Sequence, residues 1–342
     1  MKDTHRTRDR YRVLQIHVTR RCNLRCLHCY SSSAPEEDGR VDFDALCGAL
    51  SDASAEGFTV AGFSGGEPLL YKPLPELLRH ARSCGMRTTV TSNGMLLDQR
   101  RLAALRGNLD LLAISLDGAP DAHDRMRASP GAFHAMASRL HGVRAAGIPF
   151  GFIFTLTNDN VDELPWVARF ALDSGARLLH VHPLEMLGRA NAGAAGRPPD
   201  RTARVRARME CLRIQQSAGD TLYVQLDLLS PLDATAGSTA FFTGDGRPDP
   251  QHTALAELAN PLVIEADGMV VPVEYAFARR YALGNLADAS LRILADRWKR
   301  EVYPAFRDLC REVHSRVAAD PVRSLLNPYD AVARQARAAS SV

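Results

Sequence analysis

The chain has 342 residues, 46% of them hydrophobic, which is enough apolar material for one large domain or two ordinary ones. Its 42 basic and 39 acidic residues leave a net charge of +3, which is too small to favour nucleic acid or an anionic membrane as the main partner. No apolar run approaches the roughly 20 residues that cross a bilayer, and the N-terminus lacks the apolar stretch of a secretory signal. We therefore expect a cytoplasmic globular protein.

Short β-rich runs alternate with amphipathic stretches over the first half of the chain. Each amphipathic stretch ends at a glycine, as a helix C-cap would. This alternation predicts an α/β fold with a parallel sheet. We expect a partial (βα)6 TIM-like barrel, with a doubly wound open sheet as the alternative; in both folds functional residues gather at the carboxyl ends of the strands. The predicted strands span residues 12–18, 58–64, 86–92, 110–116, 149–156 and 177–184.

The composition changes after Gly188, where GRANAGAAGRPPD forms a connector rich in glycine, alanine and proline. We place a domain boundary here, with one unit at 1–188 and a smaller α+β unit at 189–342. Asp200 is a candidate N-cap for a helix at 201–217, and Asp267-Gly268 is a candidate hairpin turn. The other predictions for the second unit are a strand at 222–229, a polar loop at 235–252 and helices at 288–304 and 321–339.

Three of the seven cysteines, Cys22, Cys26 and Cys29, follow the first predicted strand with the spacing C-x3-C-x2-C. Three thiolates from one loop can hold three corners of an iron–sulfur cluster and leave one corner open, whereas a closed zinc site needs a fourth ligand. A zinc site completed by His28 or by a distant histidine is the alternative. The odd total argues against a secreted disulfide scaffold. We expect the remaining cysteines to be packing residues: Cys47, Cys84, Cys211 and Cys310.

The cysteine spacing resembles that of the radical S-adenosylmethionine (radical SAM) superfamily. The resemblance implies one [4Fe–4S] cluster on Cys22, Cys26 and Cys29, with S-adenosylmethionine (AdoMet) chelated to the open iron. It further implies one-electron cleavage of AdoMet to a 5′-deoxyadenosyl radical, which abstracts hydrogen from a substrate, and a reductase such as flavodoxin or ferredoxin as electron donor. The backbone of His28 would lie near the adenine.

The sequence SGGEP at residues 64–68, where the second predicted strand ends, is by itself only a strand-to-helix turn. It is not a phosphate loop, because no Gly-Lys-Ser/Thr follows. In register with the cysteines it resembles the GGE motif of the radical SAM family. The resemblance implies that the AdoMet ammonium group is received by Ser64, Gly65, Gly66 and Glu67.

TSNG at 91–94 and SLDG at 115–118 end the next two predicted strands, and either alone would be a turn. Residues 115–133 resemble the fourth-strand region of radical SAM enzymes that carry a SPASM or twitch extension. This implies that Ser115 and Arg127 contact the AdoMet ribose and carboxylate; a solvated helix-face arginine is the alternative. Asn93 is expected near the cofactor, and Asp117 is a candidate catalytic residue.

Residues 260–298 resemble the SPASM or twitch extension in degenerate form. In the family, one cysteine precedes the first hairpin strand and another follows the hairpin proline, and both hold an auxiliary cluster. Here Val273 follows Pro272, and residues 253–261 contain no cysteine, so we expect no auxiliary cluster. Glu274 and Tyr275 would take the space of that cluster and are candidate catalytic residues.

Other side chains could also handle protons or contact the substrate. His180 and His182 alternate with Val181 in the sixth predicted strand and therefore share one face. They are either core residues or substrate contacts. His123 and Glu185 are further acid–base candidates, and spacing distinguishes none of them.

The expected substrate is a small natural product, such as a sugar, nucleoside or sugar acid, that undergoes decarboxylation, epimerisation or rearrangement. Only 21 residues precede Cys22, so we do not expect the fused leader-binding module of many peptide-maturing relatives. A peptide (RiPP) maturase with a separate leader-binding partner is the first alternative. A non-catalytic iron–sulfur or zinc protein is the second. The sequence indicates no oligomeric state.

Overall fold

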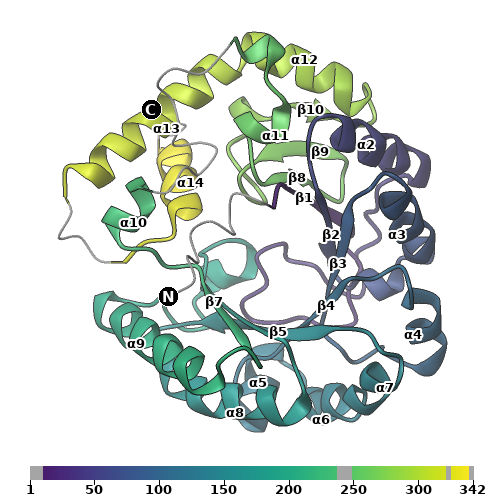
Figure 1. Cartoon of the computed structure of the whole chain (residues 1–342), viewed down its shortest axis with the longest axis vertical. Helices are drawn as coiled ribbons and strands as arrows, with labels where there is room; N and C mark the ends of the chain where they lie inside the picture. The colour runs from purple at the N-terminus through teal and green to yellow at the C-terminus, as the bar shows by residue number, and fades with distance from the viewer. Residues whose placement is uncertain (1–10, 237–248, 321–324, 339–342) are drawn as a thin grey trace.

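The computed structural model describes residues 11–236, 249–320 and 325–338. Its centre is a curved sheet with helices along the outer face, the arrangement of a partial TIM-like barrel (Figure 1). The parallel strands are Val13–Thr19 (β1), Val60–Gly65 (β2), Arg87–Ser92 (β3), Leu111–Ser115 (β4), Phe150–Leu156 (β5), Leu178–Pro183 (β6) and Tyr223–Leu226 (β7). Each lies beside the next in chain order. This order confirms the predicted barrel and not the doubly wound alternative, in which the order reverses.

The helices of the barrel pack one apolar face on the sheet and turn the other to solvent. In Leu74–Ser83 (α3), Leu74, Leu77, Leu78 and Ala81 are buried, the spacing of one helix face. Hydrophobic burial between these faces and the strands makes a continuous core. The other barrel helices are Phe43–Ala55 (α2), Gln99–Leu105 (α4), Pro120–Arg127 (α5), Ala132–Ala137 (α6), Leu140–Ala145 (α7), Leu164–Ser174 (α8) and Arg201–Ala218 (α9).

The residues after 188 add to both edges of the barrel sheet. β7 pairs with β6 at one edge, and Leu262–Ile264 (β8) pairs in parallel with β1 at the other. Met269–Pro272 (β9) and Gly284–Asn285 (β10) continue the second edge as antiparallel strands. The strands on both sides of residue 188 therefore share one sheet, and the division into 1–188 and 189–342 stays a prediction.

Local signals in this second part are confirmed in detail. The Asp200 side chain accepts a hydrogen bond from the Ala203 backbone N–H at the start of α9. β8 and β9 form the expected hairpin around Gly268, whose φ is +86°. The polar loop predicted at 235–252 lies mostly outside the described residues.

The C-terminal helices differ from the prediction in number. Two helices were expected, at 288–304 and 321–339, but the structure has Leu291–Glu301 (α12), Tyr303–Ala318 (α13) and Pro328–Ala338 (α14); residues 321–324 lie outside the described part. Pro304 stands in the first turn of α13, where a proline is tolerated, and it cannot continue a preceding helix. Figure 1 shows α14 inward of α13, toward the open side of the barrel. The remaining α-helices of the described residues are short, Pro231–Ala236 (α10) and Leu255–Leu258 (α11), and five 3-10 helices of three to five residues lie between the longer elements.

Among the described residues, every helix is too short or too polar to cross a membrane.

Candidate active site

The three clustered cysteines lie in the loop that follows β1. Cys22 and Cys26 are buried, and Cys29 is half-buried. Backbone hydrogen bonds hold the loop to its surroundings: Cys22 N–H donates to Ala34 O (3.1 Å), and Leu27 N–H donates to Met126 O at the end of α5 (3.0 Å). The loop is therefore part of a packed wall.

Arg189 also supports the cysteine loop, a role that the sequence analysis missed. Its Nε donates to the backbone oxygen of Cys26 (3.0 Å), and its Nη2 donates to Ser33 O (2.6 Å). Neighbouring Gly188 has a φ of +55°, and a Cβ there would lie 2.3 Å from the backbone oxygen of Tyr30. The connector after β6 therefore packs against the cysteine loop. The only indication of this contact in the sequence was the Gly-Arg pair at the start of the connector.

The donor set fits an iron–sulfur cluster better than a single ion. Thiolates that share one zinc ion at about 2.3 Å lie about 4 Å apart. Among the described residues, the sulfur atoms of the three cysteines do not all lie within 4.8 Å of one another. His28 does not form such a group with any two of them either. Burial, together with the charges of Glu67 and the other two cysteines, raises the pKa of the Cys22 thiol to about 12. Burial also raises the pKa of Cys26, against the lowering by the Arg127 guanidinium, and a bound metal centre would stabilise the thiolate forms.

The SGG turn, residues 64–66 at the end of β2, packs against the start of the cysteine loop. Gly66 N–H donates to Thr19 O (2.7 Å), and Glu67 N–H donates to Arg21 O (2.9 Å). A Cβ on Gly66 would lie 2.2 Å from the backbone oxygen of Arg21, so only glycine fits. Ser64, Gly65 and Gly66 line the interior cavity described below.

The Glu67 carboxylate does not face the cavity, contrary to the expectation that it receives an ammonium group. Glu67 is fully buried. Its Oε1 accepts hydrogen bonds from Leu69 N–H (3.1 Å) and Ser92 Oγ–H (2.9 Å), and its Oε2 accepts one from Asn93 N–H (2.9 Å). The carboxylate thus ties the end of β2 to the end of β3, and residues 64–66 line the cavity in its place.

Arg127 is buried at the end of α5, which excludes the alternative of a solvated arginine. Its Nε lies 2.7 Å from Asp117 Oδ2, and its Nη1 donates to Cys26 Sγ at 3.6 Å. Burial alone would raise the pKa of Asp117, but the Arg127 guanidinium, with help from His28 and His123, lowers it below its usual value. Asp117 is therefore an ionised partner that orients Arg127. It is not a free acid or base.

The other expected cofactor contacts border the same space. Ser115, Asn93 and His28 line the cavity. Asn93 Nδ2 donates to Asn23 Oδ1 in the cysteine loop at 2.8 Å. His28 Nε2 lies 3.8 Å from Asp117 Oδ1, and its buried Nδ1 has no hydrogen-bond partner.

The hairpin extension reaches the cysteine loop, as expected for Glu274 and Tyr275. The Tyr275 ring stacks on His17 of β1, with ring centres 4.8 Å apart and an interplanar angle of 19°. It also meets the edge of Tyr30, which follows Cys29, at 5.4 Å. The segment after β9 therefore forms cavity wall beside the predicted cluster site.

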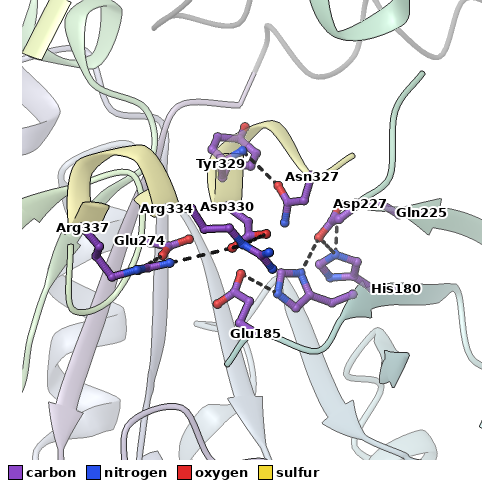
Figure 2. Close-up of polar contacts among 11 residues, drawn as sticks. His180, Glu185, Gln225, Asp227, Glu274, Asn327, Tyr329, Asp330, Arg334 and Arg337 are labelled. Carbon is purple, nitrogen blue, oxygen red and sulfur yellow. Dashed lines mark hydrogen bonds and ion pairs between the residues drawn. The ribbon is translucent and has the colours of Figure 1, made fainter. Parts of the chain in front are cut away.

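Glu274 is a buried carboxyl with one oxygen in an ion pair and one without a partner. Its Oε1 accepts a hydrogen bond from Arg337 Nη1 of α14 at 2.9 Å, while Oε2 has no hydrogen-bond partner. Figure 2 shows Glu185 and Asp330 near this pair. Burial and the charge of Glu185 raise the pKa of Glu274 to about 8 despite Arg337, and Asp330 adds to the rise. Glu274 is therefore mostly protonated near neutral pH.

A second polar cluster stands on the β6–β7 side of the cavity (Figure 2). His180 and His182 both line the cavity, which confirms that they share a face. Asp227 Oδ2 lies 2.5 Å from His180 Nε2 and 2.9 Å from His182 Nδ1, and His182 Nε2 lies 3.0 Å from Glu185 Oε1. Burial would lower the pKa of His182, but Glu185 and Asp227 raise it well above its usual value. Asp227 was missed because only β6–β7 pairing brings it to the histidines.

One cavity of about 830 Å³ borders most of these groups. Its wall includes the three cysteines, the SGG turn, Ser115 and Arg127, and also the His180–Asp227 cluster, Glu274 and Tyr275. A volume of this size suits a cofactor together with a small ligand. The remaining cysteines lie elsewhere: Cys211 and Cys310 are buried in α9 and α13, and Cys47 and Cys84 pack against the core.

Replacing Glu274 with glutamine should change how stability depends on pH. The pKa of Glu274 in the folded chain, about 8, is above its ordinary value of 4.5. Between these values folding takes up a proton, so the wild-type free energy of unfolding falls as pH rises from about 4.5 to about 8. The glutamine variant lacks this loss, and its stability relative to wild type should therefore increase over that range and level off above it.

Denaturant unfolding at pH values of about 5, 7 and 9 measures the effect. Glu76→Gln on the surface of α3, where the side chain is 48% exposed, is the matched control. Parallel pH profiles for wild type and Glu274→Gln would contradict a protonated Glu274.

Comparison with known proteins agrees with this geometry. Residues 16–171 match the Radical SAM superfamily. These residues form a radical SAM domain. The radical SAM family uses a [4Fe–4S] cluster and AdoMet, and the buried Cys22, Cys26 and Cys29 supply a donor set that fits such a cluster.

Two curated relatives are similar to about half of this chain. It is 36% identical over 161 residues to the Fe-coproporphyrin III synthase of Methanosarcina barkeri, across 46% of this chain and 40% of that protein. It is 32% identical over 187 residues to the PqqA peptide cyclase of Ruegeria pomeroyi, across 54% of this chain and 50% of that protein. The alignments thus span half or less of each relative's length.

A solved structure shares the fold of almost the whole chain. The structure of native anSMEcpe with bound AdoMet superposes with a TM-score of 0.65, covering 94% of this chain and 95% of that chain. The sequence identity is 17%, so this likeness concerns the fold.

Proposed function

We propose that the chain is a radical SAM enzyme that binds AdoMet between the cysteine loop and Arg127 and holds its substrate in the same cavity. The observation that carries the proposal is the single cavity that borders both the cysteines and the polar wall of Glu274, His182 and Asp227. When bound, the [4Fe–4S] cluster would supply the electron that cleaves AdoMet to a 5′-deoxyadenosyl radical, which abstracts hydrogen from the substrate. Flavodoxin or ferredoxin would be the reductant, and a reducing compartment such as the cytoplasm suits seven free cysteines.

The chain's own residues position the cofactor. Arg127 is held rigidly by Asp117, and its planar guanidinium suits the AdoMet carboxylate. Ser64, Gly65 and Gly66 line the cavity at the end of β2, and Ser115 lines it at the end of β4. These groups come from rigid strand ends, which favours the orientation that hydrogen abstraction needs.

Glu274 and Tyr275 are proposed to act on the substrate side. The unpartnered Oε2 of Glu274 belongs to a carboxyl that is mostly protonated near neutral pH, so it can donate a hydrogen bond or a proton to a bound group. Tyr275 is held between His17 and Tyr30 and can limit the movement of a ligand beside the cofactor. Asp117 does not reach the substrate side, because its carboxylate is fully buried against Arg127.

The favoured substrate is a small natural product with ionisable or hydroxyl groups, such as a sugar, nucleoside or sugar acid. The cavity volume and its wall, with Asp227 negative and His182 positive, support this class. The reaction would be decarboxylation, epimerisation or rearrangement. Similarity to a PqqA peptide cyclase favours the second candidate, a peptide maturase working with a separate leader-binding partner.

Deuterium transfer distinguishes the two substrate classes. Cells are grown in D₂O, and their extract is separated into a small-metabolite fraction and a peptide fraction. The cluster-loaded enzyme is incubated anaerobically with AdoMet, dithionite and each fraction in turn. Because the radical removes a substrate hydrogen, the proposal predicts deuterium in 5′-deoxyadenosine only with the small-metabolite fraction. Deuterium transfer from the peptide fraction alone would overturn the small-molecule assignment. Cleavage of AdoMet without transfer from either fraction would contradict both.

A further inference from the structure

Two histidines and an aspartate in the cavity wall lie close enough together to share a metal ion. β6 and β7 are parallel neighbours, so their carboxyl ends bring together His180, His182 and Asp227. Their ligand atoms lie within 4.8 Å of one another, and Oδ2 of Asp227 is 2.5 Å from His180 Nε2 and 2.9 Å from His182 Nδ1. Ligands held at about 2.0–2.1 Å from one ion lie about 3 Å apart, so small shifts would close the set around a metal.

Glu185 and Gln225 contact these side chains in the way that outer hydrogen-bond partners support the ligands of a metal site. His182 directs Nδ1 to Asp227 and Nε2 to Glu185 Oε1, 3.0 Å away. Gln225 Nε2 donates to the other Asp227 oxygen, Oδ1, at 3.1 Å. A ligating histidine usually donates its second ring N–H to a carboxylate, and a ligating carboxylate is itself held by a hydrogen bond. Glu185 and Gln225 therefore orient His182 and Asp227 through atoms that a metal would not use.

We propose that His180, His182 and Asp227 bind a divalent transition-metal ion, such as Zn²⁺, Fe²⁺ or Mn²⁺, in the cavity wall, separately from the cysteine cluster. Two imidazoles and one carboxylate are a donor set that leaves coordination positions open. The three side chains are 23%, 33% and 15% exposed and all line the cavity, so the open positions face the ligand space. An ion there would coordinate an oxygen or nitrogen of a molecule bound in the cavity.

Binding is tested with Mn²⁺, which prefers nitrogen and oxygen over thiolate ligands, so that free cysteines compete little. The full-length, cluster-loaded protein is titrated with Mn²⁺ under anaerobic conditions, and the free ion is followed by its EPR signal. About one Mn²⁺ per chain should bind, and added Zn²⁺ should displace it, because zinc stands higher in the affinity order.

Variants connect the binding to these residues. Asp227→Ala and His180→Ala should abolish Mn²⁺ binding, and Glu185→Gln should weaken it about 10- to 100-fold. His252→Ala, at a histidine whose side chain is 83% exposed, is the control and should bind like wild type. Circular dichroism and iron content identify any variant that fails to fold; Asp227→Asn, of nearly the same shape, then replaces Asp227→Ala.

The proposal is overturned if the folded wild type binds neither Mn²⁺ nor Zn²⁺, or if binding is the same in Asp227→Asn and His180→Ala as in wild type. The first outcome would mean that His180, His182 and Asp227 form an ion-pair network in which protons take the place of the metal. Iron content and 5′-deoxyadenosine formation are measured on the same samples, so a failure of the radical SAM assignment is separately visible.

Discussion

Replacing Arg127 with alanine is expected to lower the free energy of unfolding by about 3–5 kcal/mol, the range for removing one partner of a buried ion pair. Asp117 has no exposed surface and would be left as an uncompensated buried carboxylate. Arg125→Ala, at an exposed position of the same helix, is the matched control and should have little effect. Denaturant unfolding of both variants measures the difference, and equal midpoints for the two would contradict the buried pair.

A second variant separates the structural role of Arg127 from its role toward AdoMet. In Asp117→Leu/Arg127→Met both charges are replaced by apolar groups of similar size, so much of the lost stability should return. AdoMet cleavage should not return, because no guanidinium would be available for the AdoMet carboxylate. Recovery of 5′-deoxyadenosine formation together with stability would show that Arg127 has only a structural role.

Gly66→Ala should disrupt the cluster site from a position with no functional group of its own. The added Cβ would lie 2.2 Å from the backbone oxygen of Arg21, and backbone at the root of the cysteine loop cannot move aside as a flexible side chain could. Strain of this kind commonly costs about 1–3 kcal/mol or more. The loop should shift, so we expect reduced stability together with reduced iron content after reconstitution.

Gly48→Ala in α2 is the matched control, because nothing lies within 4 Å of the new Cβ. Alanine is favoured over glycine inside a helix by about 0.5–1 kcal/mol, so this variant should be slightly more stable than wild type, with unchanged iron content. If Gly66→Ala retained wild-type iron content and stability, the packing of the SGG turn against the cysteine loop would be of no consequence.

The barrel strands were predictable because strands buried in a parallel sheet are short apolar runs bounded by turn residues. The run at 177–184, for example, became Leu178–Pro183. The edges of the sheet were not predictable, since a short strand such as Leu262–Ile264 carries no signal for the strand it pairs with. The predicted helix at 288–304 stopped at Pro304, so the separate helix that begins there, α13, was missed.

The residues of the site likewise fall into those that the sequence could reveal and those that it could not. Motifs contiguous in the chain, such as the three cysteines and the SGG turn, were visible from their spacing. Arg189, Asp227 and Arg337 had no such signal, because each acts on residues from 45 or more positions away that only the fold brings close. Glu67 was assigned to a ligand because a carboxylate suits an ammonium, but its hydrogen bonds to Ser92 and Asn93 depend on the pairing of β2 with β3.

The most direct test of the radical SAM assignment is anaerobic reconstitution, followed by counts of iron and sulfide and by dithionite-dependent formation of 5′-deoxyadenosine from AdoMet. We expect about four irons per chain and deoxyadenosine formation, both lost in Cys26→Ala and retained in Cys47→Ala. Bound zinc without deoxyadenosine would contradict the account and return the three cysteines to a structural role. About eight irons would mean a second cluster, against the expectation from Val273.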